Sequence, residues 1–372
     1  MTSTVKAQRP LRVVVVDDSA YNRQTITSII EELEGVCVVG RAMNGKEALR
    51  MVFDLEPDVV TLDLEMPEMD GFAFLRLLMG KRPTPVIVVS GFSGRENVFR
   101  ALELGALDFI AKPSRDIGPD LRSIGDEIKA KIGMVRRLQA IRLQQRAFDL
   151  LEQKVARGTT TSAGARRPAR TPRPGPERGA PARNLVVVGS STGGPPALQL
   201  LLGKLPQAMK AAVVVAQHMP PRFTAAFAER LDRVLDVRVK EAEDGEALLE
   251  GTVYIAPGGH NVEVFGAPGA GRVRVAPRQS GAVVAPSADL LFETAAASFG
   301  PRTCAVVLTG MGSDGSVGIR SVVAGGGTAY AEDPQTAVMP GMPSSACATG
   351  LVERAAPVDR LGEIVEAWLE RT

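Results

Sequence analysis

The strongest constraint on the fold is an alternation between short Val- and Ile-rich runs and longer amphipathic stretches. In the first third of the chain, the apolar runs are residues 11–18, 36–42, 57–63, 84–91 and 106–113. The stretches with apolar residues at helical spacing are 21–33, 45–54, 71–79 and 95–104. Apolar runs without alternation are typical of strands buried on both faces. The pattern therefore predicts an α/β domain of (βα)5 type with a parallel sheet between two helical layers.

The alternation resumes in the second half of the chain. Clear strand-like runs are 185–190, 211–218 and 303–310, and shorter ones that suit a hairpin or a sheet edge are 251–259 and 272–277. Helical patterns occur at 195–203, 221–234, 287–299, 314–324 and 358–371. These elements predict a second α/β domain, doubly wound around a mostly parallel sheet.

A change of composition separates the two halves. Helical periodicity extends from about 116 to 156, and residues 157–183 are rich in Pro, Gly, Ala and Arg. Such a segment buries too little apolar surface to offset its ordering entropy. We interpret 11–133 as the first domain, 134–183 as a linker and 184–372 as the second domain. The arginines of the linker suit a solvated spacer or a weak anchor for an acidic partner.

Composition excludes several classes of protein. No apolar run reaches the roughly 20 residues that span a bilayer, and no signal peptide is recognisable, so we expect a cytoplasmic protein without membrane insertion. A net charge of +2 argues against nucleic acid as a partner. The cysteines Cys37, Cys304 and Cys347 are too scattered for a disulfide framework or a metal site. Only two histidines, His218 and His260, could supply an imidazole.

Polar residues end successive strands of the first domain. Asp17 and Asp18 end the first strand, Asp63 the third, Ser90 the fourth and Lys112 the fifth. The carboxyl ends of parallel strands share one edge of a sheet, so these groups should meet there. Three carboxylates suit Mg²⁺, and a hydroxyl and an ammonium beside Asp63 suit a phosphoryl group. The cluster predicts phosphorylation of Asp63.

A second set of polar residues ends strands of the C-terminal domain. Ser191 lies in Gly-Ser-Ser-Thr-Gly-Gly between a strand and a Pro-initiated helix, and this run matches G-x-S-x-G. His218 ends the next strand, and Asp314 lies in the glycine-rich turn after the strand at 303–310. Together they predict a nucleophile, a general base and an orienting acid. Their order along the chain differs from that of ordinary α/β-hydrolases.

Each residue also has a simpler interpretation. The glycine-rich run could cradle a phosphate, although it lacks the Lys of a P-loop. His218 alone could be a packed core residue, and Asp314 could cap a turn. A cysteine nucleophile is disfavoured because Cys304 begins a strand and Cys347 lies in no suitable turn. His260, in a Gly-rich loop, could line the pocket or belong to a turn.

Residues 11–113 resemble response-regulator receiver domains, which have a flavodoxin-like fold. The resemblance implies that Asp17, Asp18 and Asp63 bind Mg²⁺, with the backbone carbonyl of Glu65 as a further ligand. It also implies that Ser90, Lys112 and Phe109 form the switch. Because Phe109 lacks a phenolic hydroxyl, its part of the switch can act only through packing.

Residues 184–350 resemble the chemotaxis protein-glutamate methylesterases. The resemblance rests on Gly-Ser-Ser-Thr-Gly-Gly, Gln-His-Met-Pro-Pro, Thr-Gly-Met-Gly-Ser-Asp-Gly and Gly-Met-Pro. It implies that Ser191, His218 and Asp314 are catalytic, and that Thr192, Met311 and His260 lie at the oxyanion region or the pocket. Ser190 stands where alanine is frequent, which adds a second hydroxyl beside Ser191.

The resemblance implies hydrolysis of glutamate γ-methyl esters on methyl-accepting chemotaxis receptors, and deamidation of receptor glutamines. A chemotaxis histidine kinase would phosphorylate Asp63 with Mg²⁺, and hydrolysis itself would need no cofactor. We expect the unphosphorylated receiver to cover the catalytic mouth. Two other functions stay open: a receiver with a binding-only output domain, and an esterase for small soluble metabolites.

Overall fold

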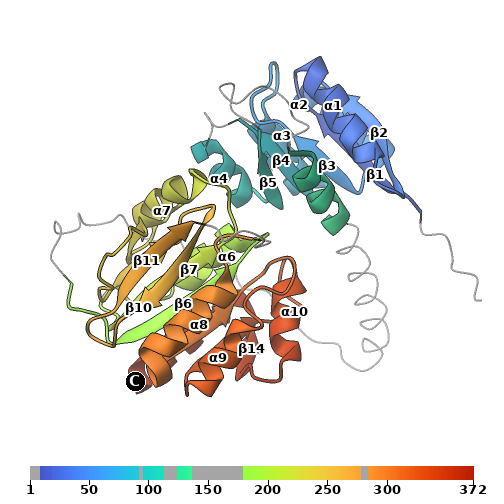
Figure 1. Cartoon of the computed structure of the whole chain (residues 1–372). Helices are drawn as coiled ribbons and strands as arrows, with labels where there is room; N and C mark the ends of the chain where they lie inside the picture. Colours follow the sequence, from blue (N-terminus) through green and yellow to red (C-terminus); the bar gives the residue numbers. More distant parts are fainter. Residues whose placement is uncertain (1–8, 92–94, 113–123, 136–178, 278–283) are drawn as a thin grey trace, which may run out of the picture.

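The computed structural model describes residues 9–91, 95–112, 124–135, 179–277 and 284–372. The expected linker from 134 to 183 and the long helical stretch from 116 to 156 lie largely outside these ranges. The two domains lie against each other in Figure 1, the N-terminal one above the C-terminal one. No helix in the part of the chain that is described could span a bilayer.

The N-terminal domain has the expected receiver architecture. Its five strands are all parallel, in the order β2-β1-β3-β4-β5. The strands are β1 (Leu11–Val16), β2 (Val36–Ala42), β3 (Val59–Leu62), β4 (Val86–Ser90) and β5 (Asp108–Ala111). The helices are α1 (Ala20–Glu31), α2 (Gly45–Leu55), α3 (Gly71–Lys81) and α4 (Arg95–Glu103), and residues 125–135 are also helical. The (βα)5 prediction is confirmed.

Local sequence explains where these helices begin. Ser19, Asn44 and Asp70 are the N-cap residues of α1, α2 and α3, and each side chain accepts a backbone N–H of the first turn. The strands before α1 and α3 are largely buried and the edge strand β2 before α2 is mostly half-buried, and the polar caps mark the points where the chain leaves these strands. The caps therefore fix the loops that carry the acidic residues.

The C-terminal domain is built on a seven-stranded parallel sheet in the order β14-β13-β12-β6-β7-β9-β8. These strands are β6 (Asn184–Ser190), β7 (Ala211–Gln217), β8 (Arg238–Glu241), β9 (Thr252–Ile255), β12 (Thr303–Val307), β13 (Thr328–Glu332) and β14 (Arg354–Ala356). The chain leaves β6 toward β7 on one side, and β12 lies on the other. The carboxyl end of β6 is thus a topological switch point, the usual ligand site of such sheets.

Helices cover both faces of this sheet (Figure 1). They are α6 (Gly194–Leu202), α7 (Phe223–Val234), α8 (Ala288–Phe299), α9 (Gly318–Ala324), α10 (Gly341–Ala348) and α11 (Val358–Arg371). A separate antiparallel hairpin joins β10 (His260–Phe265) to β11 (Arg272–Pro277). The run at 272–277 is therefore a hairpin strand as expected, whereas the run at 251–259 supplies β9 of the main sheet.

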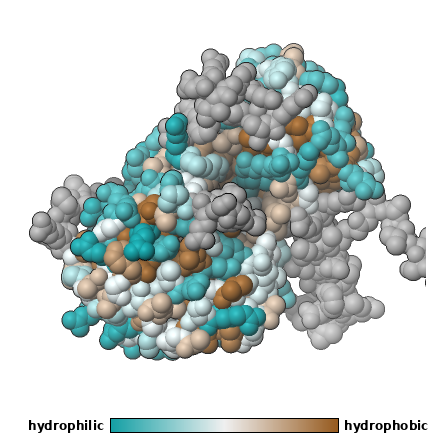
Figure 2. All heavy atoms as spheres, in the orientation of Figure 1, coloured by the Kyte–Doolittle hydropathy of each residue, from teal (hydrophilic) through white to brown (hydrophobic). Residues whose placement is uncertain are grey.

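The two domains share an apolar contact. Helices α4 and α7 lie side by side, and Phe99 of the receiver stacks on Phe227 with ring centroids 5.3 Å apart. Phe109 packs against Phe223 at 4.8 Å. One cluster of buried apolar residues runs through both domains at this point. Elsewhere on the face seen in Figure 2, apolar side chains are interspersed with polar ones on both domains.

Candidate active site and phosphorylation site

The turn after β6 presents Ser191 at the switch point. Gly193 adopts a φ of 76°, and a Cβ at Gly194 would approach Gln217 Oε1 to 1.9 Å, so both positions require glycine. The helix α6 then starts with two prolines, which suit the first helical positions. The amide of Ser191 donates to Thr309 O at 3.0 Å, which ties this turn to the segment that follows β12.

Ser190 and Gln217 join the ends of β6 and β7. The Ser190 hydroxyl donates to Gln217 Oε1 at 2.7 Å, and Gln217 Nε2 donates to the carbonyl oxygens of Ser191 and His218, each at 2.9 Å. Both side chains are buried. One amide thus holds the backbone of Ser191 and of His218, and the hydroxyl of Ser190 is committed to this network.

His218 and Asp314 form a direct hydrogen bond. His218 Nε2 lies 2.8 Å from Asp314 Oδ2. Because the carboxylate occupies Nε2, Nδ1 is the ring nitrogen available to other partners. His218 itself follows β7, and its amide donates to Ser190 O at 2.9 Å. The histidine is therefore positioned by β6 on one side and by the turn after β12 on the other.

Asp314 lies at the N-terminus of α8. Its carboxylate accepts the backbone amides of Ala288 at 2.7 Å and Asp289 at 2.9 Å, together with the Ser287 hydroxyl at 3.1 Å. Burial acts to raise the pKa of Asp314, but the hydrogen bonds from His218 and these amides lower it to about 2. Asp314 is thus ionised at neutral pH.

Ser191, His218 and Asp314 follow β6, β7 and β12, three adjacent strands of the sheet. Within the described residues, Ser191 Oγ accepts and donates no hydrogen bond, while its backbone is held on both sides. The ends of the neighbouring strands β6 and β7 thus carry an unengaged hydroxyl and a carboxylate-bound imidazole, respectively. Such a set can perform nucleophilic catalysis once a substrate brings the hydroxyl and Nδ1 together.

The three residues expected near the oxyanion have different surroundings. Thr192 is buried, and its hydroxyl donates at 2.6 Å to Oδ2 of Asp108, a receiver residue. Met311 packs against an apolar cluster that joins Met339 to receiver residues. His260 is exposed at the start of β10, with Nδ1 3.3 Å from Gly258 O.

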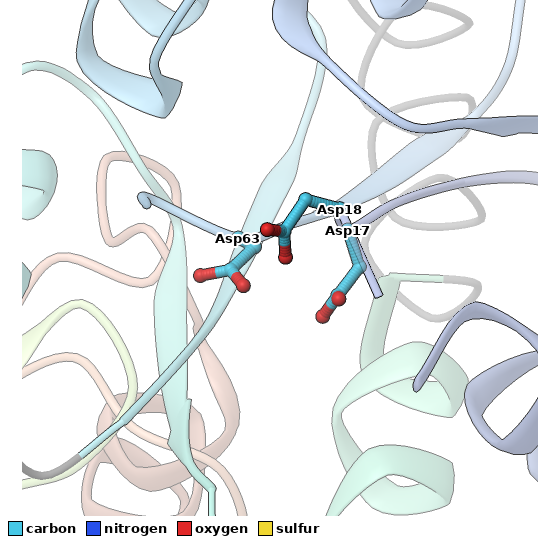
Figure 3. A group of neighbouring side chains, drawn as sticks. All are labelled: Asp17, Asp18 and Asp63. Carbon is cyan, nitrogen blue, oxygen red and sulfur yellow. The ribbon is translucent and has the colours of Figure 1, made fainter. Parts of the chain in front are cut away.

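The acidic residues of the receiver gather at the ends of β1 and β3 (Figure 3). One carboxylate oxygen from each of Asp17, Asp18 and Asp63 lies within 4.8 Å of the others. Hard oxygen donors at this spacing fit Mg²⁺, which accepts a few carboxylates and keeps several waters. The backbone of Glu65 lies beside them, with its amide 3.3 Å from Asp63 Oδ1.

Lys112 bridges two of these carboxylates. Its Nζ lies 2.5 Å from Asp63 Oδ2 and 2.8 Å from Asp17 Oδ2. Burial acts to lower the pKa of Lys112, but the two carboxylates raise it above its usual value, so the side chain stays cationic. A fixed cation beside Asp63 suits a phosphoryl group.

The other switch residues lie on the strands that lead to this edge. Ser90 ends β4 and is buried, and Phe109 lies on β5 next to Asp108. The Phe109 ring contacts Phe223 of the C-terminal domain. The strand β5 therefore connects the phosphorylation site, through Lys112, with the contact to the C-terminal domain, through Phe109.

Sequence reasoning did not identify Gln217, Asp108 or Glu332 as parts of the site. Gln217 and Glu332 end strands next to catalytic candidates, and that position was the available signal. Asp108 has no comparable signal, because its role depends on how the domains pack.

Fold and site define the class of this protein: a receiver joined to an α/β domain whose switch point carries a serine, a histidine and an ionised aspartate. Comparison with family models gives the same division. The model described as response regulator receiver domain matches residues 13–118, and the one described as CheB methylesterase matches residues 186–365. These domain matches confirm the family resemblance stated from the sequence.

Full-length relatives are similar along the whole chain. A protein-glutamate methylesterase/protein-glutamine glutaminase of Geobacter sulfurreducens is 46% identical, over 96% of this chain and 97% of that relative. One of the same name from Anaeromyxobacter dehalogenans is also 46% identical, over 95% and 94%. This chain belongs to the CheB methylesterase family.

Solved structures match each half separately. The catalytic domain of Thermotoga maritima CheB methylesterase is 39% identical, with a TM-score of 0.49, and covers 51% of this chain and 100% of that structure. The response regulator domain of Thermotoga maritima CheB is 42% identical, with a TM-score of 0.33, over 34% and 96%.

Proposed function

We propose that this chain removes methyl groups from glutamate γ-methyl esters of chemoreceptors by a Ser-His-Asp mechanism, and so supports chemosensory adaptation. The observation that carries the proposal is the junction of β6, β7 and β12, where the ionised Asp314 holds His218 one strand away from Ser191. The names of the full-length relatives supply the substrate class.

In the proposed reaction, Ser191 Oγ attacks the ester carbonyl carbon while His218 Nδ1 takes the hydroxyl proton. The resulting oxyanion is stabilised by backbone N–H groups of the glycine-rich turn between β6 and α6, and Asp314 stabilises the imidazolium. The imidazolium returns its proton to the departing methoxy group, which leaves as methanol. A water molecule, deprotonated by His218, then cleaves the glutamyl-serine ester and releases a glutamate carboxylate.

The same steps convert a glutamine to a glutamate when ammonia leaves in place of methanol. The relatives are named for both activities, and we propose both here. None of these steps needs a metal, since the imidazole and the backbone N–H groups of the turn supply the proton transfer and the charge stabilisation.

We further propose that a histidine kinase phosphorylates Asp63 with Mg²⁺ held by Asp17, Asp18, Asp63 and the Glu65 carbonyl. Mg²⁺ would neutralise charge on the transferring phosphoryl group. Lys112, which now pairs with Asp63, and Ser90 would then bind the phosphoryl oxygens. This exchange of partners changes the surroundings of β4 and β5, and β5 carries Phe109 and Asp108.

Domain contacts support inhibition by the unphosphorylated receiver. Asp108 accepts the hydroxyl of Thr192, the residue next to Ser191. Met311 packs on the apolar cluster shared with the receiver, and Phe109 packs on Phe223 at the start of α7. The receiver therefore occupies the rim of the proposed catalytic mouth, and its release would open it.

The direct test is methanol release from methylated receptor fragments, with and without Mg²⁺ and a small-molecule phosphodonor. We expect the phosphodonor to raise the rate and Ser191→Ala to abolish it. Free glutamate methyl esters serve as the alternative substrate. Equal turnover of free esters and receptor would favour a metabolite esterase, and receptor binding without Ser191-dependent methanol release would favour a binding-only domain.

A further inference from the structure

Glu332 is a buried carboxylic acid beneath the site that the proposed mechanism does not use. It ends β13, only 2% of its surface is exposed, and its Oε2 accepts the backbone amide of Thr309 at 2.8 Å. Burying a carboxylic acid costs free energy of folding unless the group is hydrogen-bonded, and here the hydrogen bond comes from one backbone N–H.

Thr309 connects Glu332 to the turn that carries the nucleophile. Its carbonyl oxygen accepts the amide of Ser191 at 3.0 Å, and its hydroxyl donates to the carbonyl of Thr192 at 2.9 Å. The same hydroxyl accepts the amide of Met339 at 2.7 Å. Thr309, whose amide Glu332 holds, is therefore hydrogen-bonded through its carbonyl to Ser191 and through its side chain to Thr192.

We propose that Glu332 is a positioning residue for hydrolysis, whose carboxylate fixes the Thr309 peptide and thereby the placement of Ser191. The inference rests on the proposed esterase function and adds a residue to it. Glu332 touches neither substrate nor reacting atoms. It acts by fixing the position of the backbone that carries Ser191, and small displacements of the Ser191 hydroxyl would lower the rate.

The surroundings of Glu332 bring its ionisation into a pH range in which kcat can be measured. Burial raises the pKa of Glu332 to about 7, with the Thr309 amide opposing and the charge of Asp333 adding to the rise. On the neighbouring strand β14, Glu332 pairs with the uncharged Ala356. On α10, the ionisable group is Cys347, whose own pKa is raised by burial and Asp333. As the pH rises through this range, Glu332 becomes a carboxylate and a stronger acceptor for Thr309.

The test compares kcat of the full chain with that of Glu332→Gln across pH, on a methylated receptor fragment. The Gln amide oxygen keeps an acceptor for Thr309 but cannot ionise. We expect the wild-type to variant ratio of kcat to be close to one below about pH 6, and to rise to roughly threefold to tenfold above about pH 8. KM should change little. Any pH dependence that the two proteins share cancels in this ratio.

Glu353→Gln is the matched control, since it removes an exposed carboxylate just before the neighbouring strand β14. Its ratio should stay near one at every pH. Glu332→Ala, which removes the acceptor, should lower kcat at all pH values, and far-UV circular dichroism checks its fold.

A Glu332→Gln ratio that does not vary with pH, in a folded protein, would overturn the proposal, because a merely structural role predicts a constant ratio. Failure of the esterase proposal is distinguishable. In that case wild type would itself release no methanol, or would release it independently of Ser191.

Discussion

At the scale of single residues, backbone contacts hold the catalytic candidates more than contacts among their own side chains do. The Ser191 backbone is held by Thr309 and Gln217, and the His218 backbone by Ser190 and Gln217. Asp314 is anchored by the first turn of α8. Substitutions at these supporting residues should therefore affect stability and rate in separable ways.

Replacing Asp314 with Asn tests the ionised acid. Asn cannot compensate the charge of the imidazolium, so we expect kcat to fall by roughly 10³–10⁴-fold with KM little changed. Single-turnover methanol release measures the chemical step. A loss of less than about tenfold would show that the carboxylate is dispensable.

The same residue predicts a pH dependence of stability. Its pKa of about 2 lies below the ordinary 3.8, so its stabilisation is complete above about pH 4 and is lost as the pH falls toward 2. At 1.36 kcal/mol per unit, the contribution is about 2 kcal/mol. Urea unfolding of wild type and Asp314→Asn should differ at pH 6 and converge near pH 2.

Ser190→Ala tests the network between β6 and β7. The substitution leaves the buried Gln217 Oε1 without its donor, which should cost about 1–2 kcal/mol in the free energy of unfolding. The carbonyl contacts of Gln217 persist, so kcat should fall less than about threefold. Denaturation and kinetics of one preparation measure both quantities. A large loss of kcat at unchanged stability would contradict this view and assign Ser190 a role in the chemistry.

At the scale of elements, the contact of α4 and β5 with α7 joins the regulator to the enzyme. Phe227→Ala removes the ring that stacks on Phe99, so the inhibited form should become less favoured. We expect the unphosphorylated protein to release methanol roughly threefold to tenfold faster, with little change after phosphorylation. Phe265→Ala, on the β10–β11 hairpin, is the control. An unchanged basal rate in folded Phe227→Ala protein would mean that this contact is not inhibitory.

The same scale shows what could be predicted from the sequence. Strands with uninterrupted Val, such as β1 and β6, and helices with a polar cap or paired prolines were located to within a few residues. The strands β8, β10, β13 and β14 and the helix α10 were missed. Arg-Val-Lys-Glu and Thr-Ala-Tyr-Ala-Glu carry little β-branched bulk, and β14 has three residues, so their pairing depends on neighbouring strands.

The residues of the site likewise fall into those that could be predicted from the sequence and those that could not. Residues that end strong strands could be placed at one edge from topology alone, which brought Ser191, His218 and Asp314 together in the prediction. Thr192 was expected at the oxyanion region, and its hydrogen bond to Asp108 depends on domain packing that no local pattern encodes. The support given by Gln217 and Glu332 likewise depends on atoms that meet only in the folded chain.

At the scale of the whole molecule, separating the domains is the broadest test of inhibition. A fragment should begin at Gly179, because Ala180 accepts the amide of Glu250 and Ala182 donates to the carbonyl of Leu248. If the receiver covers the mouth, this fragment should release methanol faster than the unphosphorylated full chain and ignore phosphodonors. A fragment no faster than the full chain, yet equally stable to heat, would rule out steric inhibition.

The hydrogen bond between Thr192 and Asp108 also has a thermodynamic corollary. If receptor and receiver need the same rim, then each excludes the other, and linkage requires the exclusion to be reciprocal. A methylated receptor that displaces the receiver must favour phosphorylation of Asp63 by the factor by which phosphorylation favours receptor binding. Under the proposed function, a methylated receptor thus acts as a ligand of the switch and would help to activate its own demethylation.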